Sequence, residues 1–254
     1  MIGAIGDALL LAERNLRRLP RNPDLLVGVT FQPIMFVVLF TYVFGGAIST
    51  PGFDYIDFLL PGIVIQMIAF TGYATSLGIS DDLRKGLIDR FRSLPIARSA
   101  VIAGRTLSDV AMNVIALVTM VVVGFIVGFS FNSPVAEIVA GFALVLLFGY
   151  AMSWVYAYIG LISSTPESAS ALITIIIFPL TFVSSVYVPT KSMPEVFAAI
   201  ANANPITTIV DALRALWLGA PAHTDVWVSL IWCVGIIAAF SVLATARYRR
   251  TVAR

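Results

Sequence analysis

Residues 58–80 read FLLPGIVIQMIAFTGYATSLGIS, and the chain continues directly with DDLRKGLIDRFRSLPIARSAVIAGR at residues 81–105. The first stretch holds no charged residue and is long enough to cross about 30 Å of hydrocarbon, which takes a helix of roughly 20 residues. The second stretch is rich in charges, and charges are costly inside a bilayer. The junction after Ser80 therefore predicts the place where a membrane span ends.

Long uncharged runs of this kind recur along the chain. They cover residues 25–53, 58–80, 110–136, 138–166, 168–190 and 226–246. Lipid offers the backbone no hydrogen bonds, and these runs lack the alternation of a barrel strand, so helices are expected. Of 254 residues, 59% are hydrophobic and 12% are charged, against about 25% charged residues in soluble domains. We expect an all-α integral membrane protein with six transmembrane helices in a single domain over residues 1–254.

The basic residues give this arrangement an orientation. Apart from Lys191 and Arg214, every Lys and Arg lies before the first run, in the connection after the second run, or in the C-terminal tail. Cytoplasmic flanks of membrane helices are enriched in Lys and Arg. We therefore expect a multi-pass protein of the cytoplasmic membrane with both termini in the cytoplasm. The net charge of +2 reflects this topology, and no nucleic-acid partner is expected.

Residues 1–23 have the pattern of an amphipathic helix. Apolar residues recur at three- and four-residue steps, while Arg14, Arg17 and Arg18 occupy the other face. Such a helix is expected to lie along the cytoplasmic surface of the membrane. Two interpretations stay open, a surface anchor alone and an anchor that also docks a cytoplasmic partner.

Residues 81–98 are predicted to hold a short cytoplasmic helix. Ser80 is placed to cap it, with two carboxylates in its first turn. The apolar residues at helical spacing form one stripe, which we name the coupling stripe: Leu83, Leu87, Phe91 and Leu94. Pro95 ends the helix. The stripe is expected to be buried, either against the protein's own spans and the lipid surface or against a partner.

Residues 192–219 are apolar but carry the signals of two short external helices. Ser192 and Glu195 have the spacing of a capping box. Asn204 is expected to cap the second helix, with Pro205 at its first position and Gly219 at its end.

Three further features of the apolar segments suggest structure. Asp211 and Arg214 are expected to pair on the surface of the second external helix, with Trp217 as an interfacial anchor. Thr165 is placed to cap the fifth span, followed by Pro166. Gly124 and Gly128 form a GxxxG motif, which we interpret as a packing notch within the chain rather than as the seam between two chains.

Several kinds of chemistry are missing from the sequence. The lysines Lys85 and Lys191 lie in no phosphate-binding loop of the form G-x-x-x-x-G-K-[ST]. His223 is the sole histidine and Cys233 the sole cysteine, so no nucleophilic triad and no His or Cys metal site is expected within one chain. No catalytic residue, metal or cofactor is therefore expected on this chain.

A proton-driven carrier needs ionisable residues deep in its spans. Asp109 comes closest to that position, and Arg105, one turn before it, is expected to pair with it near the inner surface. A secondary carrier is therefore disfavoured.

Two stretches carry a family resemblance. RKGLIDRFRSLPIARSAVIAGR from Arg84 and NPITTIVDALRALWLG from Asn204, with LPGI at residues 60–63, resemble the permease subunits of type-2 ABC exporters, and among them the daunorubicin-resistance permease family. The resemblance covers nearly the whole chain. Leu87 and Asp89 stand where many relatives have Thr and Glu.

The resemblance implies a bacterial complex of two permease subunits, as a homodimer or heterodimer, with two copies of a cytoplasmic ABC ATPase subunit that bind ATP and Mg. The residues that would couple this chain to the ATPase are Asp82, Leu83, Arg84, Leu87, Asp89, Arg90, Phe91, Arg92, Leu94, Pro95, Arg14, Arg17 and Arg18. The cargo would pass between two permease copies, mainly along the first, second and fifth spans. Polar residues there that are candidates to face it are Gln32, Gln66, Thr71, Tyr73, Thr174, Thr181 and Ser184.

We therefore expect the membrane-spanning permease subunit of an ATP-driven exporter that moves a hydrophobic or amphipathic compound, such as a drug, antibiotic or lipid, out of a bacterial cell. The alternative is the permease of a lipid-linked polysaccharide exporter. Aromatic residues such as Phe148 and Trp154 do not separate the two, because interfacial aromatic belts give the same composition. A secondary carrier and a membrane scaffold without transport are the remaining alternatives.

Overall fold

The computed structural model describes residues 31, 34–45, 52, 54–85, 98–219 and 223–252, and these residues form helices and no strand. The expected interfacial helix over residues 1–23 and most of the coupling stripe lie outside them. The described helices in chain order are η2 (Phe40–Phe44), α3 (Tyr55–Thr71), α4 (Tyr73–Arg84), α6 (Arg98–Val127), α7 (Val135–Ile162), α8 (Pro166–Phe182), η3 (Thr190–Ser192), α9 (Glu195–Ala203), α10 (Pro205–Leu218) and α11 (His223–Val252).

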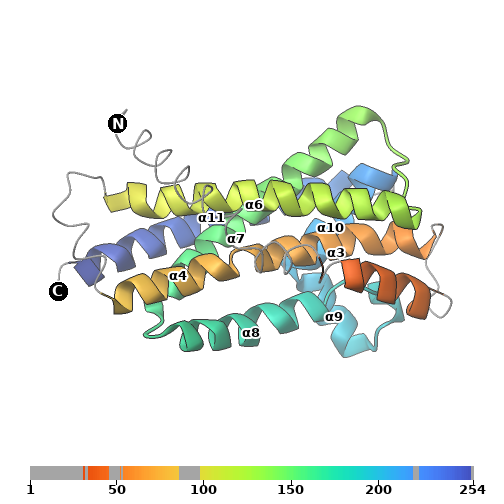
Figure 1. The fold of residues 1–254 in the computed structure, drawn as a ribbon. Helices are drawn as coiled ribbons and strands as arrows, with labels where there is room; N and C mark the ends of the chain where they lie inside the picture. Colours follow the sequence, from red (N-terminus) through yellow and green to blue (C-terminus); the bar gives the residue numbers. More distant parts are fainter. Residues whose placement is uncertain are drawn as a thin grey trace.

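The long helices run roughly along one axis (Figure 1). The ends of α4 and α11 and the start of α6 lie together at one end, which we name the basic end because Arg84, Arg98 and Arg247 belong to it. The chain turns between α6 and α7 at the other end, which we name the opposite end. The charge pattern of the sequence therefore corresponds to one end of the bundle.

The apolar run at residues 58–80 forms α3 and α4, with a break at Gly72. A side chain at Gly72 would overlap the ring of Tyr156 from α7. The Tyr156 hydroxyl donates a 2.5 Å hydrogen bond to the carbonyl oxygen of Ala69 just before the break. A helix break inside a membrane is tolerated when neighbouring helices bond the backbone around it, and the Tyr156 hydroxyl supplies one such bond.

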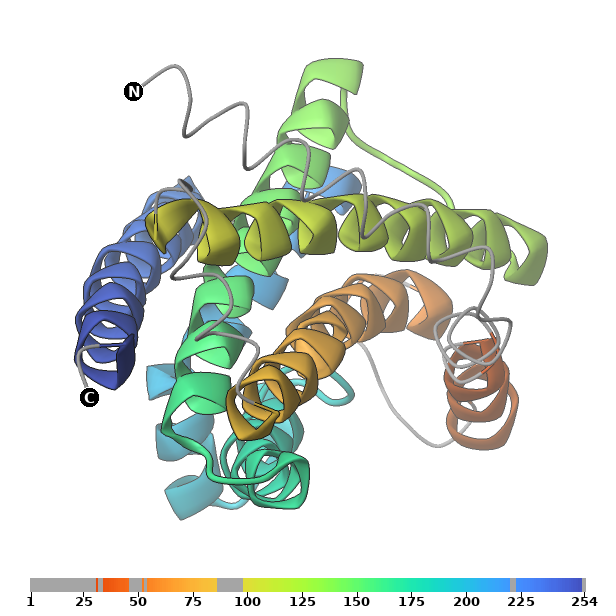
Figure 2. The same ribbon diagram turned by 60° about the vertical axis from the view of Figure 1, so that its left-hand side comes forward.

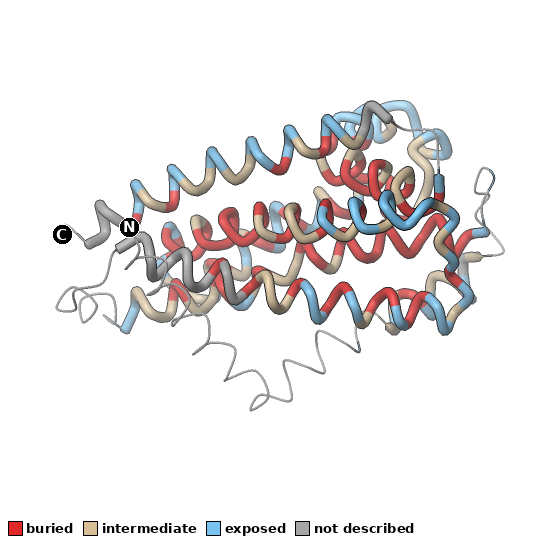
Figure 3. Tube along the Cα trace, turned by 90° about the horizontal axis from the view of Figure 1, so that it is seen from above, coloured by how far each residue is buried: buried red, intermediate tan, exposed pale blue. Residues whose placement is uncertain are grey.

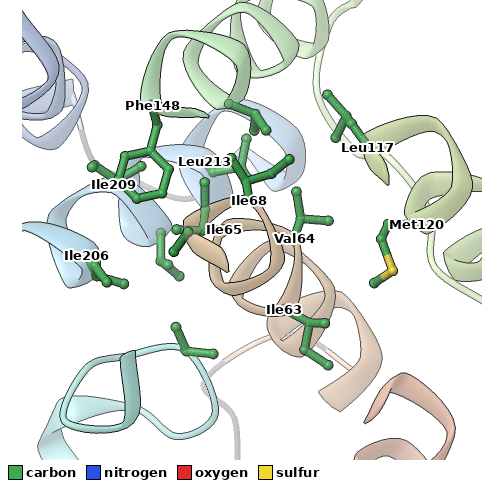
Figure 4. Close-up of a cluster of buried hydrophobic side chains, with 14 of the residues drawn as sticks. Ile63, Val64, Ile65, Ile68, Leu117, Met120, Phe148, Ile206, Ile209 and Leu213 are labelled. Carbon is green, nitrogen blue, oxygen red and sulfur yellow. The ribbon is translucent and has the colours of Figure 1, made fainter. Parts of the chain in front are cut away.

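α3 lies at the centre of the bundle, surrounded by α6, α7, α8 and α10 (Figure 2). The cluster of buried side chains in Figure 4 shows this arrangement, with Ile65 and Ile68 of α3 close to Phe148 of α7 and Leu213 of α10. Nearly all residues of α3 are buried. This explains why the run is apolar on every side, since it has no face that meets water.

α11 is the most exposed of the long helices, and blue residues recur along it in Figure 3. Its outward side chains include Trp227, Ile231 and Val242, and α6 exposes a similar apolar row with Val118, Val122, Phe125 and Ile126. Such surfaces suit a bilayer, where exposed apolar residues carry no penalty. The fold is that of a multi-pass membrane protein.

Among the described residues, four helical stretches are long and apolar enough to cross a membrane, and five if α9 and α10, bent by 75°, are counted as one. The four are Tyr55–Arg84, Asp109–Val127, Val135–Ile162 and Val226–Tyr248, and Ile34–Val43 and Pro166–Phe182 are shorter apolar helices. These two short helices occupy the first and fifth expected spans. The count of six spans stays a prediction, and the fifth helix ends at Phe182, earlier than expected.

Two of the predicted helix starts are wrong. α4 continues through Ser80 to Arg84, and the Ser80 hydroxyl donates to the carbonyl oxygen of Leu77 inside the helix. α9 begins after Pro194 without a side-chain cap, while the Ser192 hydroxyl donates to Pro189. Ser80 lies inside a helix that already begins at Tyr73, and Ser192 is the last residue of η3, so neither hydroxyl stands at a helix start that it could cap.

Three other predicted helix ends are confirmed. Thr165 caps α8 and accepts from the backbone amide of Ser168. Asn204 caps α10 with Pro205 at its first position, and Gly219 ends it with a φ of 69°, a backbone conformation that favours glycine. Of the predicted GxxxG packing notch, Gly124 is confirmed, because a side chain there would overlap Leu60 of the same chain, whereas Gly128 lies past the end of α6 with open space around it.

Candidate functional site

Arg214 of α10 is buried near the opposite end. It forms the predicted ion pair with Asp211, with 2.8 Å between Nη1 and Oδ1. The pair does not lie on the helix surface, because the Arg214 side chain is only 7% exposed, against 38% for Asp211. The Arg214 guanidinium also lies over the ring of Phe58 in α3, 3.5 Å from its centre. The expectation of a surface ion pair is therefore wrong, because α3 covers this face of α10.

Trp217 shares this burial and is no interfacial anchor. It is fully buried among the rings of Phe129, Phe131 and Phe142. Its indole nitrogen donates to the carbonyl oxygen of Ile138, at 3.4 Å. The aromatic residue at the end of α10 thus packs inside the bundle rather than at a lipid interface.

The chain between α8 and η3 is irregular but buried at residues 184–187. Side chains of α10 and its cap satisfy its backbone. Asn204 Nδ2 donates to the carbonyl oxygens of Leu180 and Val183, at 2.6 and 2.7 Å. Thr207 Oγ1 accepts from the backbone amide of Ser185, at 3.1 Å. Such bonds allow irregular backbone to lie inside a membrane protein.

Arg214 also binds this irregular segment, which with Val183 covers residues 183–187. Its Nη2 donates to the carbonyl oxygens of Ser185 and Val186, at 2.7 and 3.3 Å. Its Nη1 donates to the Ser185 hydroxyl, at 3.2 Å, and its Nε donates to the carbonyl oxygen of Phe58, at 2.9 Å. We name this set of contacts the Arg214 network. It joins α3, residues 183–187 and α10.

A row of aromatic rings crosses the same region. Phe36 stacks on Phe40, Phe40 on Tyr187, Tyr187 lies against Phe182, and Phe182 stacks on Phe178, with ring centres 5.9, 4.5, 5.3 and 4.3 Å apart. We name this the aromatic row. Phe178 and Phe182 are exposed on α8, whereas Tyr187 is buried and donates a 2.5 Å hydrogen bond to Gln66 of α3. The middle of the row is therefore held by a buried polar contact, and its α8 end lies on an exposed apolar surface.

A second polar cluster lies around the break at Gly72. Thr71 donates to Asn113 Oδ1 of α6, at 2.5 Å, and Thr75 donates to Asp109 Oδ1, at 2.6 Å. Thr106, Asp109 and Asn113 are buried at helical spacing on α6. We name these contacts the Gly72 cluster. It joins α3 and α4 to α6. Of these, α4 and α6 lie on either side of the predicted coupling segment.

The residues predicted to couple to an ATPase are described only in part. α4 carries Asp82, Leu83 and Arg84 at its end, and Leu83 packs against a small cluster with Trp154 and Tyr248. Asp81 pairs there with Lys85, at 2.6 Å. The remaining residues of that prediction lie outside the described residues: Leu87, Asp89, Arg90, Phe91, Arg92, Leu94, Pro95, Arg14, Arg17 and Arg18. The side chain of Arg105, the expected partner of Asp109, also lies outside them.

The candidate pathway residues are placed unequally. Thr174 is exposed on α8 and Tyr73 bonds Ser170 across α4 and α8. Gln66 is buried and accepts a hydrogen bond from Tyr187, and Thr71 donates a hydrogen bond to Asn113. Thr181 and Ser184 are buried, and their hydroxyls bond backbone carbonyls of their own segment. Gln32 lies outside the described residues.

Sequence reasoning missed Asn113, Ser185 and Tyr187. Asn113 is a polar residue in an apolar run, a signal that was readable and was overlooked. Ser185 and Tyr187 lie in the fifth run, where a helix was expected. In a helix their backbone groups would have formed hydrogen bonds within the helix. The irregular structure of that segment depends on donors from α10, which local sequence does not reveal.

The described residues contain no group of three His, Cys, Asp or Glu side chains that could hold a metal ion. The buried polar groups instead bond one another and the backbone between helices. Together with the apolar outer surfaces, this defines a helical membrane protein with polar networks at two depths.

The sequence matches the profile of the ABC-2 type transporter family over residues 7–218. The daunorubicin resistance ABC transporter permease protein DrrB1 of Streptomyces coeruleorubidus is 34% identical over 89% of this chain and 80% of its own length. The probable doxorubicin resistance ABC transporter permease protein DrrC of Mycobacterium tuberculosis is 22% identical over 97% of this chain and 89% of its own. The inner membrane transport permease YadH of Escherichia coli is 22% identical over 76% and 77%.

These similarities show the class of the protein, which is a membrane-spanning component of ABC transporters. The chain belongs to the ABC-2 type transporter family. The match includes the charged connection after α4 and all of α10, the two regions on which the resemblance rests.

Proposed function

We propose that this chain is the permease subunit of an ATP-driven exporter that moves a hydrophobic or amphipathic compound, such as a drug, antibiotic or lipid, out of a bacterial cell. The observation that carries the proposal is the similarity to a daunorubicin resistance permease over 89% of the chain. Two permease copies, in a homodimer or heterodimer, assemble with two cytoplasmic ABC ATPase subunits, which bind ATP and Mg. This chain itself hydrolyses no ATP.

The basic end is the cytoplasmic end in this proposal. The concentration of Lys and Arg supports it. Both termini are then cytoplasmic, and the coupling segment at residues 81–98 connects α4 with α6 on that side. Closure of the ATPase pair would push on this segment and on the N-terminal helix and so move α4 and α6, which the Gly72 cluster joins.

The exposed face of α8 forms part of the cargo pathway in this proposal. α8 has 17 residues, which span about 25 Å, less than the hydrocarbon thickness. A short helix followed by irregular chain suits a surface that faces protein or a cavity rather than lipid. The exposed rings of the aromatic row support a flat apolar cargo there, since aromatic groups stack favourably at such spacings.

The test reconstitutes the chain with its ATPase in proteoliposomes and measures ATP hydrolysis and uptake into inside-out vesicles. Flat aromatic drugs are expected to stimulate both, whereas stimulation by lipid-linked glycans alone would favour the polysaccharide exporter.

Phe91→Asp is expected to leave basal ATP hydrolysis unchanged and to abolish transport, because it places a charge in the coupling stripe. Ser93→Asp adds the same charge off the stripe and serves as the control. Unchanged export by Phe91→Asp would contradict the coupling role.

The pathway has its own test. The double variant Phe178→Leu and Phe182→Leu removes the exposed stacking surface and is expected to raise the apparent KM for aromatic cargo about tenfold, since stacked pairs contribute about 0.5–1.5 kcal/mol each. Phe125→Leu, exposed on α6, is the matched control and is expected to leave KM unchanged. Equal effects of both changes would place the pathway elsewhere.

A further inference from the structure

The guanidinium of Arg214 has no free donor. An arginine side chain carries five N–H groups in a fixed fork. Here Nε donates to Phe58 O, Nη1 donates to Asp211 Oδ1 and Ser185 Oγ, and Nη2 donates to Ser185 O and Val186 O. Five donors thus meet five oxygens. Arg214 therefore offers no donor to an anionic cargo in this state, although a buried arginine in a transporter would otherwise suggest a binding site.

These five oxygens come from three separate parts of the chain. One belongs to α3, three belong to residues 183–187, and one belongs to α10. Truncation of Arg214 would leave buried carbonyl oxygens without donors and Asp211 without its cation, which is costly in a water-poor interior. The side chain is placed to keep the three parts in one arrangement.

The contact between α3 and residues 183–187 is also close at the backbone. A side chain at Gly62 would overlap the carbonyl oxygen of Val186. Gly62 follows Pro61, which interrupts the hydrogen bonding of α3 in the same turn that offers the Phe58 carbonyl to Arg214. The LPGI stretch at residues 60–63 and α10 are far apart in sequence, yet both contact residues 183–187.

We propose that Arg214 is a positioning residue of the transport pathway. It fixes residues 183–187, and with them Tyr187 of the aromatic row, against α3 and α10, so that the outer half of α3, residues 183–187 and α10 move as one rigid body. The change of access then takes place at the Gly72 break, below that body. The inference rests on the proposed function and adds to it which parts move together.

A crosslink tests the rigid body without any cargo. In a Cys233→Ala background, Ser185→Cys and Thr207→Cys place one cysteine on each side of the contact in which the Thr207 hydroxyl now accepts from the backbone amide of Ser185. The disulfide is expected to form at the same rate in the nucleotide-free complex and in the ATP-trapped complex. A several-fold change of rate between the two states would overturn the rigid body, whether or not an exported cargo has been found.

The same crosslink then tests transport. The oxidised complex is expected to export cargo as fast as the same variant after reduction, because the two cysteines do not separate during the cycle. Export that stops on oxidation and returns on reduction would overturn the proposal. Absence of export by the unmodified protein with every cargo would instead overturn the proposed function and leave the crosslinking rates to decide the rigid body.

Two substitutions test the positioning role by different routes. Arg214→Lys keeps the charge but has three donors for five oxygens, and Gly62→Ala pushes Val186 away without any change in charge. Both are expected to lower export about tenfold while ATP hydrolysis continues, a split that loss of folded protein would not give. Gly235→Ala, with open space around it on α11, is the control. Full export by both variants, in folded complexes, would contradict the proposal.

Discussion

The two polar networks of this protein differ in how completely they are bonded. In the Arg214 network every guanidinium donor meets an oxygen. Near the Gly72 break, Asn113 Nδ2 and the hydroxyl of Ser76 are buried without a hydrogen-bond partner among the described residues. A saturated network is costly to open, whereas an unsaturated one loses less when it rearranges. The comparison indicates a rigid part toward the opposite end and a more adaptable part around the break.

The largest effect is expected from Trp217→Ala in the rigid part toward the opposite end. It removes a fully buried indole that packs on three phenylalanine rings, and by the scale of large-to-small core changes it should lower the free energy of unfolding by about 3–5 kcal/mol. Denaturant unfolding in detergent measures it. Trp227→Ala, at a side chain 71% exposed on α11, is the matched control, and equal losses would contradict tight packing around Trp217.

Gly72→Ala comes next and tests the break itself. The added methyl group overlaps the buried ring of Tyr156, and overpacking of this kind costs about 1–3 kcal/mol. Because the ring lies directly against the break, we expect export to fall more than the amount of folded protein does. Transport rates normalised to folded complex in vesicles measure the difference. A loss of stability without a change in normalised export would remove the break from the mechanism.

Tyr156→Phe makes a smaller change at the same place. It deletes the hydroxyl that bonds Ala69 O and keeps the ring. An unsatisfied buried carbonyl is expected to cost about 1–3 kcal/mol, less if water or a relaxed helix reaches it. Amide hydrogen exchange across residues 69–76 is expected to speed up. Exchange as slow as in the unmodified protein would show that the hydroxyl does not stabilise the break.

The smallest effect is expected from Thr71→Val. This nearly isosteric change removes the donor to Asn113, and interhelical hydrogen bonds in membrane proteins average about 0.6 kcal/mol. A double-mutant cycle with Asn113→Ala measures the pair. Thr174→Val, at a hydroxyl bonded within its own helix, is expected to change little. A coupling well above about 2 kcal/mol would contradict an adaptable Gly72 cluster.

Where residues bond near neighbours in sequence, prediction succeeded. Thr165, Asn204 and Gly219 end their helices as expected, because caps act over three or four residues. The Asp211 and Arg214 pair formed for the same reason. The starts proposed at Ser80 and Ser192 were wrong, because α4 and η3 already include these residues.

The sequence by itself determined a helical membrane protein, its long uncharged runs, its one basic side and its family resemblance, because hydrophobic length and charge act along the chain. Only the tertiary structure decided which face of each helix is buried. It placed Arg214 under α3, Trp217 inside the bundle, and residues 183–187 on donors of α10. These outcomes depend on which helices are neighbours in space, and apolar runs of similar composition do not encode that locally.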